Sequence, residues 1–315
     1  MTRIAAVFPG QGSQSAGMLA ALASEWPEVE TTFAEASDAL GEDLWAIVRD
    51  NPDGLLDQTQ YTQPAMLAAG VATARVWSAA GGPDPSVVAG HSLGEYTALV
   101  VAGVLDFSEA ISLVARRARL MQNAVPRGEG GMAAVLGLDD ETVASICESL
   151  PTERVVEPIN YNAPGQIVIG GHADAIEQAL EACREAGAKR AVDLPVSVPS
   201  HSSLMKEAAS ELAEVLDSVA FHVPVIPIIH NVDASAHEGV EETRAALRRQ
   251  LYNPVRWSES VQALRTAGAE MVVELGPGKV LTGLARRIDR RFPAAAVEDP
   301  DTLTQALETA AGGNE

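Results

Sequence analysis

The chain has 315 residues, of which 47% are hydrophobic and 21% charged, a balance typical of a folded globular protein rather than a disordered one. Its formal net charge is −21, so the electrostatic field around the molecule repels phosphate groups. This excludes nucleic acids and anionic membranes as expected partners, and any anionic ligand needs a local cluster of arginines.

The sequence shows no pattern typical of a signal peptide, a membrane-spanning helix or a disulfide-rich protein. The N-terminal residues reach Pro9 and Gly10 before an apolar run as long as that of a signal peptide develops. No stretch approaches the ~20 apolar residues that span a bilayer, so we expect a soluble, cytoplasmic protein. Cys147 and Cys183 form no CxxC pair, so we expect two reduced, buried thiols, no disulfide framework and no metal site.

The first third of the chain alternates short apolar runs with helical patterns. Expected strands lie at 3–8 and 86–89, and expected helices begin near 18, 95 and 106. Asp106 and Glu109 form a possible capping box at the start of the last of these helices. Strands that alternate with helices at this spacing indicate an α/β fold with a mainly parallel sheet.

The middle of the chain has a different order of elements. Expected strands at 131–137, 155–160, 166–169 and 189–194 enclose expected helices at 139–150 and 173–186. This β-α-β-β-α-β order is that of a ferredoxin-like unit. We therefore predict a large α/β domain formed by residues 1–125 and 198–315, with a small ferredoxin-like subdomain at 126–197. After the insertion, a helix is expected from His201, and strands are expected at 224–229 and 271–274.

A candidate nucleophile lies at the second predicted strand. Gly90-His-Ser-Leu-Gly94 matches the pattern G-x-S-x-G, with a strand before it and a helix after it, as the motif requires. Small flanking residues allow a sharp turn that exposes Ser92 and directs backbone N–H groups and a helix N-terminus toward a developing oxyanion. The pattern alone also occurs as a structural turn, which is the alternative interpretation.

A nucleophilic serine needs a general base. His201 follows Pro199-Ser200 at the expected start of a helix, where the helix dipole would keep the imidazole neutral, as a base requires. A surface histidine without a catalytic role is the alternative. The other histidines are weaker candidates: His91 should point away from Ser92, His172 lies in the inserted unit, His222 lies on an apolar strand, His230 ends a strand and His237 lies in an acidic loop.

An arginine interrupts the apolar face of the predicted helix at 106–124. Arg117 falls on the stripe that contains Leu113, Val114 and Leu120, where a charged group is costly unless it is paired. It either forms an internal salt bridge, or extends toward solvent, or binds a substrate carboxylate with both arms of its guanidinium. Periodicity does not decide between these interpretations.

Several short segments resemble the malonyl-CoA:acyl-carrier-protein transacylases of fatty-acid synthesis. They are Phe8–Gln14, Gly90–Tyr96, Arg117, Tyr161–Gln166, Val198–His201, Asn231–Asp233, Gln250–Pro254 and Glu274–Gly278. Each is weak alone, but they run in order over nearly the whole chain and together are specific. The resemblance implies a hydrolase-like α/β domain with an inserted ferredoxin-like subdomain, and acyl transfer from malonyl-CoA to the phosphopantetheine thiol of acyl carrier protein, with no bound cofactor or metal.

The resemblance also assigns roles to single residues. It implies Ser92 as the nucleophile, His201 as its base, the backbone N–H groups of Gln11 and Leu93 as the oxyanion hole, Arg117 as the ligand of the malonyl carboxylate, and the backbone carbonyl of Gln250 as the group that orients His201. In this family no acidic third residue accompanies the serine and histidine. Because the reaction exchanges bonds of similar energy, we expect it to be reversible.

The expected protein partner is acidic, as this chain is, so docking requires a local basic patch. The available residues are Arg116, Arg119, Arg127, Lys189, Arg190, Lys206, Arg248, Arg249, Arg286 and Arg287. The alternative for each of them is an ordinary solvated surface charge.

Three other functions remain open at this stage. An α/β-hydrolase esterase would share the serine turn but would need an acidic residue for its histidine and has no use for Arg117. A related transferase would take methylmalonyl-CoA or another extender unit. A catalytically silent docking module would need neither Ser92 nor His201. Two glycine-rich segments do not match nucleotide-binding loops, because Gly10-Gln-Gly12 lacks a third glycine and Gly276-Pro-Gly-Lys279 is followed by valine.

Overall fold

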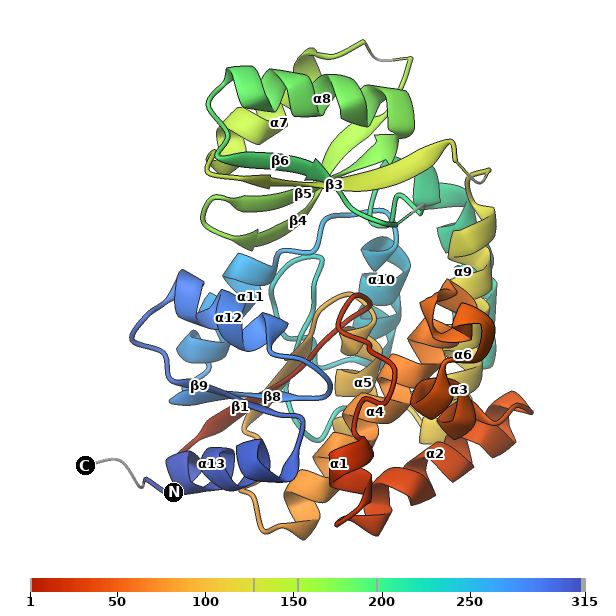
Figure 1. Cartoon of the computed structure of the whole chain (residues 1–315), viewed down its shortest axis with the longest axis vertical. Coiled ribbons are helices and arrows are strands. Elements are labelled where there is room, and N and C mark those ends of the chain that lie inside the picture. Colours follow the sequence, from red (N-terminus) through yellow and green to blue (C-terminus); the bar gives the residue numbers. More distant parts are fainter. Residues whose placement is uncertain (1, 127, 152, 197, 313–315) are drawn as a thin grey trace.

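The computed structural model describes residues 2–126, 128–151, 153–196 and 198–312 and contains two sheets (Figure 1). The larger sheet has the strand order β7-β2-β1-β8-β9, and every neighbouring pair is parallel. Its strands are β1 (Ile4–Phe8), β2 (Val87–Gly90), β7 (Ile228–Ile229), β8 (Met271–Leu275) and β9 (Ala294–Val297). The predicted parallel α/β fold is therefore confirmed, with one strand, β9, that the sequence pattern did not indicate.

The central strand β1 is buried on both faces. Ile4, Ala6 and Phe8 belong to one hydrophobic cluster, whereas Ala5 and Val7 belong to a second cluster on the opposite face. Parallel strands covered by helices on both faces are apolar throughout, because neither set of alternating side chains meets water. This explains why the sequence shows an uninterrupted apolar run here.

Helices from both ends of the chain build these two clusters. The first cluster draws on α1 (Ala20–Ala23), α2 (Pro27–Leu40), α3 (Leu44–Asp50), α4 (Thr59–Ala79), α5 (Gly94–Val101), α6 (Phe107–Asn123), α9 (Lys206–Ser218), α10 (Val240–Gln250) and α13 (Pro300–Ala310). The second draws on α11 (Trp257–Thr266) and α12 (Val280–Ile288). A short 3₁₀ helix, η1 (Pro52–Asp57), precedes α4. Over the residues that are described, no helix is both long and apolar enough to cross a membrane.

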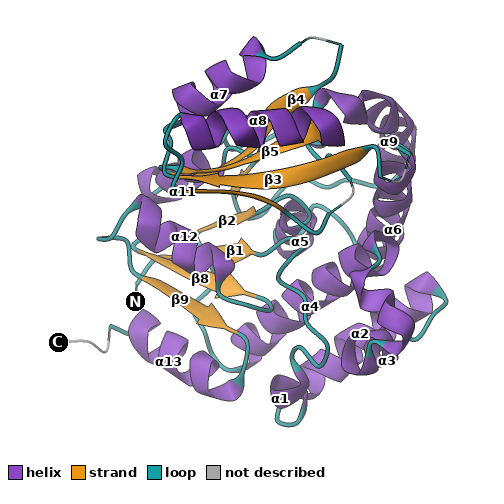
Figure 2. Ribbon diagram, turned by 45° about the horizontal axis from the view of Figure 1, so that its top comes forward, coloured by secondary structure: helices purple, strands orange, loops and turns teal. Residues whose placement is uncertain are grey.

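The second sheet comes from the continuous middle segment. Its elements are β3 (Gly130–Leu136), α7 (Asp140–Ser149), β4 (Val156–Ala163), β5 (Gln166–His172), α8 (Ala173–Glu185) and β6 (Arg190–Asp193). The strand order β4-β5-β3-β6 is antiparallel throughout, and α7 and α8 cover its outer face (Figure 2). The predicted β-α-β-β-α-β order is correct. The division of the chain at 126 and 197 stays a prediction.

Two elements after the insertion differ from the sequence prediction. His201 does not open a helix: it lies in a turn with φ 65°, followed by the 3₁₀ helix η2 (Ser203–Met205) and then by α9. The strand expected at 224–229 is reduced to the two residues of β7. Both segments contain prolines that interrupt regular hydrogen bonding, Pro199 before His201 and Pro224 and Pro227 before β7.

Candidate active site

Ser92 lies in a tight turn between β2 and α5, as the sequence predicts. Its backbone adopts φ 52°, an unfavourable region for a residue with a side chain. A Cβ atom at Gly90 would lie 1.9 Å from the carbonyl of Gly94, and one at Gly94 would lie 2.0 Å from the carbonyl oxygen of Phe8. The two glycines of the motif are therefore required by close backbone contacts.

Ser92 and His201 are in hydrogen-bond contact although they lie far apart in the sequence. The Oγ atom of Ser92 is 2.7 Å from Nε2 of His201, and Nδ1 of His201 is 2.7 Å from the carbonyl oxygen of Gln250. A carbonyl oxygen only accepts hydrogen bonds, so Nδ1 of His201 carries the proton and Nε2 accepts from the serine hydroxyl. The histidine is thus held in the tautomer that a general base needs.

Burial keeps the imidazole of His201 neutral. Its side chain is 3% exposed, and burial together with the positive charge of Arg117 lowers the pKa of His201 to about 3. The cause expected from the sequence was different, namely the dipole of a helix beginning at His201. That expectation is wrong because α9 begins only at Lys206.

Arg117 points from α6 into the same site. It is 1% exposed, and burial lowers the pKa of its guanidinium, although an arginine remains protonated in proteins. Nη1 donates to Oε1 of Gln63 at 2.8 Å and Nη2 to Oε1 of Gln250 at 3.0 Å, with Nη2 also 3.4 Å from Oγ of Ser92. The guanidinium lies over the ring of Tyr96, 5.2 Å from its centroid.

These contacts exclude two of the three interpretations of Arg117. Within the described part of the chain, no carboxylate lies at ion-pair distance from its guanidinium, so an internal salt bridge is wrong. A side chain that is 1% exposed does not extend to solvent either. A buried cation with no carboxylate partner among the residues that the structure describes, next to a candidate nucleophile, suits an anionic substrate. The carboxylate-binding role itself stays a prediction.

The candidate oxyanion donors lie at the carboxyl ends of neighbouring strands. Gln11 follows β1, and Leu93 follows Ser92 after β2. Among the described residues, neither backbone N–H donates to another protein group, whereas the N–H of Ser92 itself donates to Oδ1 of Asn231 at 2.7 Å. The N–H groups of Gln11 and Leu93 therefore remain available for a substrate oxygen, and their role stays a prediction.

Sequence reasoning missed two buried residues that hold the turn in place. Asn231 follows β7, and its Nδ2 donates to the carbonyl oxygen of Gly90 at 2.6 Å. Glu95 in α5 accepts from Nε2 of Gln250 at 2.7 Å and from the backbone N–H of Asn231 at 3.2 Å, and its other oxygen contacts Nδ1 of His230 at 2.7 Å. Both residues lie inside segments that match the family, which was the available signal.

The remaining histidines have structural partners or lie at the surface. His91 contacts Oδ1 of Asn162 at 2.8 Å, His172 accepts from the backbone of Val155 at 2.9 Å, His230 contacts Glu95, His237 contacts Asp233 at 3.1 Å, and His222 is exposed. The expectation that His222 lies on a strand is wrong, because no strand of the described structure includes it. No hydrogen bond joins His91 to Ser92 among the described residues, in agreement with the prediction that it points away.

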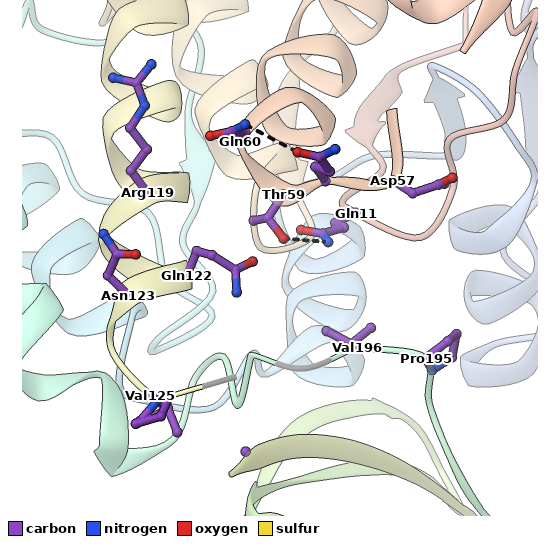
Figure 3. A pocket seen from close by; sticks show the side chains of 13 residues that line it. Gln11, Asp57, Thr59, Gln60, Arg119, Gln122, Asn123, Val125, Pro195 and Val196 are labelled. Carbon is purple, nitrogen blue, oxygen red and sulfur yellow. Dashed lines mark hydrogen bonds between the residues drawn. The ribbon is translucent and has the colours of Figure 1, made fainter. Parts of the chain in front are cut away.

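A large open pocket of about 1270 Å³ shares Gln11 with the candidate site, whereas Ser92, His201 and Arg117 do not line it. Gln11 lines it together with the start of α4, the last turns of α6 and the segment before His201 (Figure 3).

Among the described residues, Arg119 is the one member of the predicted basic docking set that lines this pocket. Arg248 pairs with Asp217, Arg249 lies 3.0 Å from Asp233, and Arg127 lies outside the described residues. The docking patch stays a prediction.

The cysteines have no contact with this site. Cys147 and Cys183 are buried in the core of the small sheet, as predicted, and burial raises the pKa of Cys147 to about 12. Burial also raises the pKa of Cys183, so both thiols favour the protonated form near neutral pH. Across the described ranges, no three His, Cys, Asp or Glu side chains gather as metal ligands would.

Comparison with known proteins gives one consistent result. The model of the acyl transferase domain family matches residues 6–297. Malonyl CoA-acyl carrier protein transacylase of Escherichia coli K12 is 53% identical over 308 residues, covering 98% of this chain and 100% of that protein. An acyl carrier protein S-malonyltransferase from Vibrio cholerae is 54% identical, with a TM-score of 0.94 over 97% of this chain and 100% of that one. A malonyl-transacylase in complex with a type II PKS acyl-carrier protein is 54% identical, with a TM-score of 0.96 over 98% and 100%. The chain therefore belongs to the acyl transferase domain family, among the malonyl-CoA:acyl-carrier-protein transacylases.

Proposed function

We propose that this acyltransferase moves the malonyl group from malonyl-CoA to the phosphopantetheine thiol of acyl carrier protein through a malonyl-Ser92 ester, and so supplies fatty-acid synthesis. The observation that carries the proposal is the position of Ser92 Oγ, 2.7 Å from the unprotonated nitrogen of His201 and 3.4 Å from a buried guanidinium without a carboxylate partner among the described residues. A candidate base and a buried cation therefore both lie within hydrogen-bond distance of Oγ of Ser92, the candidate nucleophile.

In the first half-reaction, Oγ of Ser92 attacks the thioester carbonyl of malonyl-CoA while its proton passes to Nε2 of His201. The carbonyl oxygen becomes an oxyanion that the backbone N–H groups of Gln11 and Leu93 stabilise. The C–S bond then breaks, and the CoA sulfur takes the proton from His201. The products are malonyl-Ser92 and free CoA, and His201 is again neutral.

In the second half-reaction, the phosphopantetheine thiol gives its proton to His201 and attacks the ester carbonyl of malonyl-Ser92. The C–O bond to Ser92 breaks, Oγ recovers the proton, and a new thioester forms on the carrier. The two half-reactions share one site in a ping-pong order. Ser92 and His201 carry every bond change and proton transfer of both half-reactions, which therefore need no bound cofactor or metal.

Arg117 supplies the preference for a malonyl group. Its two Nη atoms can bind both oxygens of the malonyl carboxylate, and no competing carboxylate lies at ion-pair distance among the described residues. An acetyl group would leave this buried charge unpaired. An esterase is disfavoured because Nδ1 of His201 contacts the backbone carbonyl of Gln250 rather than an acidic side chain.

The names of the relatives support the substrate and the partner. The relatives from Escherichia coli and Vibrio cholerae are named for malonyl transfer involving acyl carrier protein, and another similar structure holds an acyl-carrier protein in complex. Identity above 50% over nearly full lengths supports the same reaction here. We also propose that the chain works in the cytoplasm, where its carrier and malonyl-CoA would meet it.

A two-step mixing experiment tests the ping-pong order. The chain is first mixed with malonyl-CoA and separated from free CoA compounds, and phosphopantetheinylated acyl carrier protein is then added. We expect stoichiometric transfer of the malonyl group to the carrier within one turnover, measured by intact mass of both proteins. Carrier without its phosphopantetheine arm is the control and should remain unmodified. Release of free malonate instead of transfer would show that the chain is a hydrolase.

A further inference from the structure

We propose that Gln63 preserves the malonyl preference by holding Arg117 with an uncharged oxygen, which leaves the positive charge of the guanidinium available for the substrate carboxylate. The inference rests on the proposed function and assigns a residue that sequence reasoning did not single out. Gln63 lies on α4, is 1% exposed, and comes from a part of the chain distant from both Ser92 and His201.

The surroundings of Arg117 show how the guanidinium is held. Nη1 donates to Oε1 of Gln63 at 2.8 Å, Nη2 donates to Oε1 of Gln250 at 3.0 Å, and one face lies over Tyr96. Both oxygens belong to amides, which have dipoles but no net charge. The guanidinium is therefore fixed in direction without being neutralised.

A carboxylate could have filled either position with the same geometry. Glutamate and glutamine have the same length, and a buried arginine is more commonly paired with a carboxylate. Such an ion pair would cancel the charge that a malonyl group needs, and a second carboxylate would then be repelled. Glu95 belongs to the same network, but among the described residues its hydrogen bonds reach Arg117 through Gln250 and not directly. In this network the amide side chain of Gln250 therefore separates the carboxylate of Glu95 from the guanidinium of Arg117.

Gln63 is a better position than Gln250 for testing the effect of an added charge beside Arg117, because Gln250 has further contacts in the site. The Nε2 atom of Gln250 donates to the carbonyl oxygen of Ser92 at 2.9 Å and to Glu95, and its own carbonyl orients His201. By contrast, Nε2 of Gln63 contacts only the sulfur of Met121, at 3.6 Å, among the described residues. Changing this NH₂ group to oxygen therefore removes one weak contact and adds one charge.

The test compares Gln63→Glu with Gln63→Met, measuring kcat/KM for malonyl-CoA and acetyl-CoA on each preparation. We expect Gln63→Glu to lower the malonyl-to-acetyl ratio by about 100-fold, because the introduced carboxylate would pair with Arg117. Gln63→Met loses the hydrogen bonds of Gln63 to Arg117 and Met121 but adds no charge, so its malonyl KM should rise by about three- to tenfold with the preference retained. Gln305→Glu, exposed on α13, controls for the added charge and should behave as wild type.

The possible outcomes separate the inference from the proposed function. A ratio in Gln63→Glu equal to that of the wild type, or an equal loss of preference in Gln63→Glu and Gln63→Met, would overturn the charge argument. Because both substrates are tested on one preparation, the ratio does not depend on the folded fraction. If Gln63→Glu does not fold, Gln63→Met still decides, since an unchanged malonyl KM would exclude a role for Gln63. A wild-type chain that accepts no malonyl group would overturn the proposed function itself, and the inference with it.

Discussion

Replacing Arg117 with alanine is expected to lower kcat/KM for malonyl-CoA by about 100-fold or more, because the loss of a buried charged partner typically costs about 2–5 kcal/mol. The malonyl carboxylate would enter a buried site with no cation to bind it. The acetyl group has no carboxylate, so its transfer should remain or improve. The measurement is the rate of acylation with each CoA ester under single-turnover conditions.

Arg290→Ala is the matched control for this substitution. Arg290 has the same side chain but is exposed in the turn before β9, far in sequence from the site, so malonyl preference should not change. Thermal unfolding of both variants shows whether they are folded. Because Arg117 is buried with no ion-pair partner in the described part of the chain, its removal should not greatly destabilise the fold. An Arg117→Ala variant that still prefers malonyl-CoA as strongly as wild type would refute the assignment.

His201→Ala is expected to slow acylation of Ser92 by about 10²–10⁴-fold, the usual contribution of a general base. The substitution removes the nitrogen that lies 2.7 Å from Oγ of Ser92, which we propose as its base, but leaves Arg117 and the Gly90–Gly94 turn in place. KM for malonyl-CoA should therefore change less than kcat. His222→Ala, an exposed histidine, serves as the control. Wild-type acylation in His201→Ala would contradict the dyad.

The pH dependence of the wild type provides a second check on His201. Protonation removes the base, so the rate should fall only as pH approaches the pKa, which is about 3. A histidine with an ordinary pKa near 6.5 would lose about 25-fold in neutral fraction between about pH 7 and pH 5. We therefore expect a nearly constant acylation rate over that range, measured by rapid quench. A decline of about 25-fold would mean that His201 titrates normally.

The sequence predicts the serine turn well because its determinants are local. Gly90, Gly94 and Ser92 lie within five positions, and backbone contacts at this range follow from the motif itself. The order of elements in the small sheet was predicted for the same reason, since its strands and helices are continuous in sequence. Strand β9 and the shortened β7 were not, because short segments near prolines give little periodic signal.

The environment of the site could not be predicted from local patterns. The neutral state of His201 was expected for the wrong reason, because its burial and its proximity to Arg117 exist only in the folded chain. The pairing of Gln63 with Arg117 joins α4 to α6, and glutamine on an apolar helix gives no signal of a partner. Asn231 and Glu95 lie in segments that match the family pattern. Only the fold brings Asn231 into hydrogen-bond contact with both Glu95 and the backbone of Ser92.

The most direct test of the proposed mechanism is the intact mass of the chain after brief mixing with malonyl-CoA, beside acetyl-CoA and a Ser92→Ala variant. We expect one malonyl adduct on the wild type, little or no adduct from acetyl-CoA, and none on Ser92→Ala. A malonyl adduct that persists in Ser92→Ala would place the nucleophile elsewhere, and an acetyl adduct equal to the malonyl one would contradict the role of Arg117.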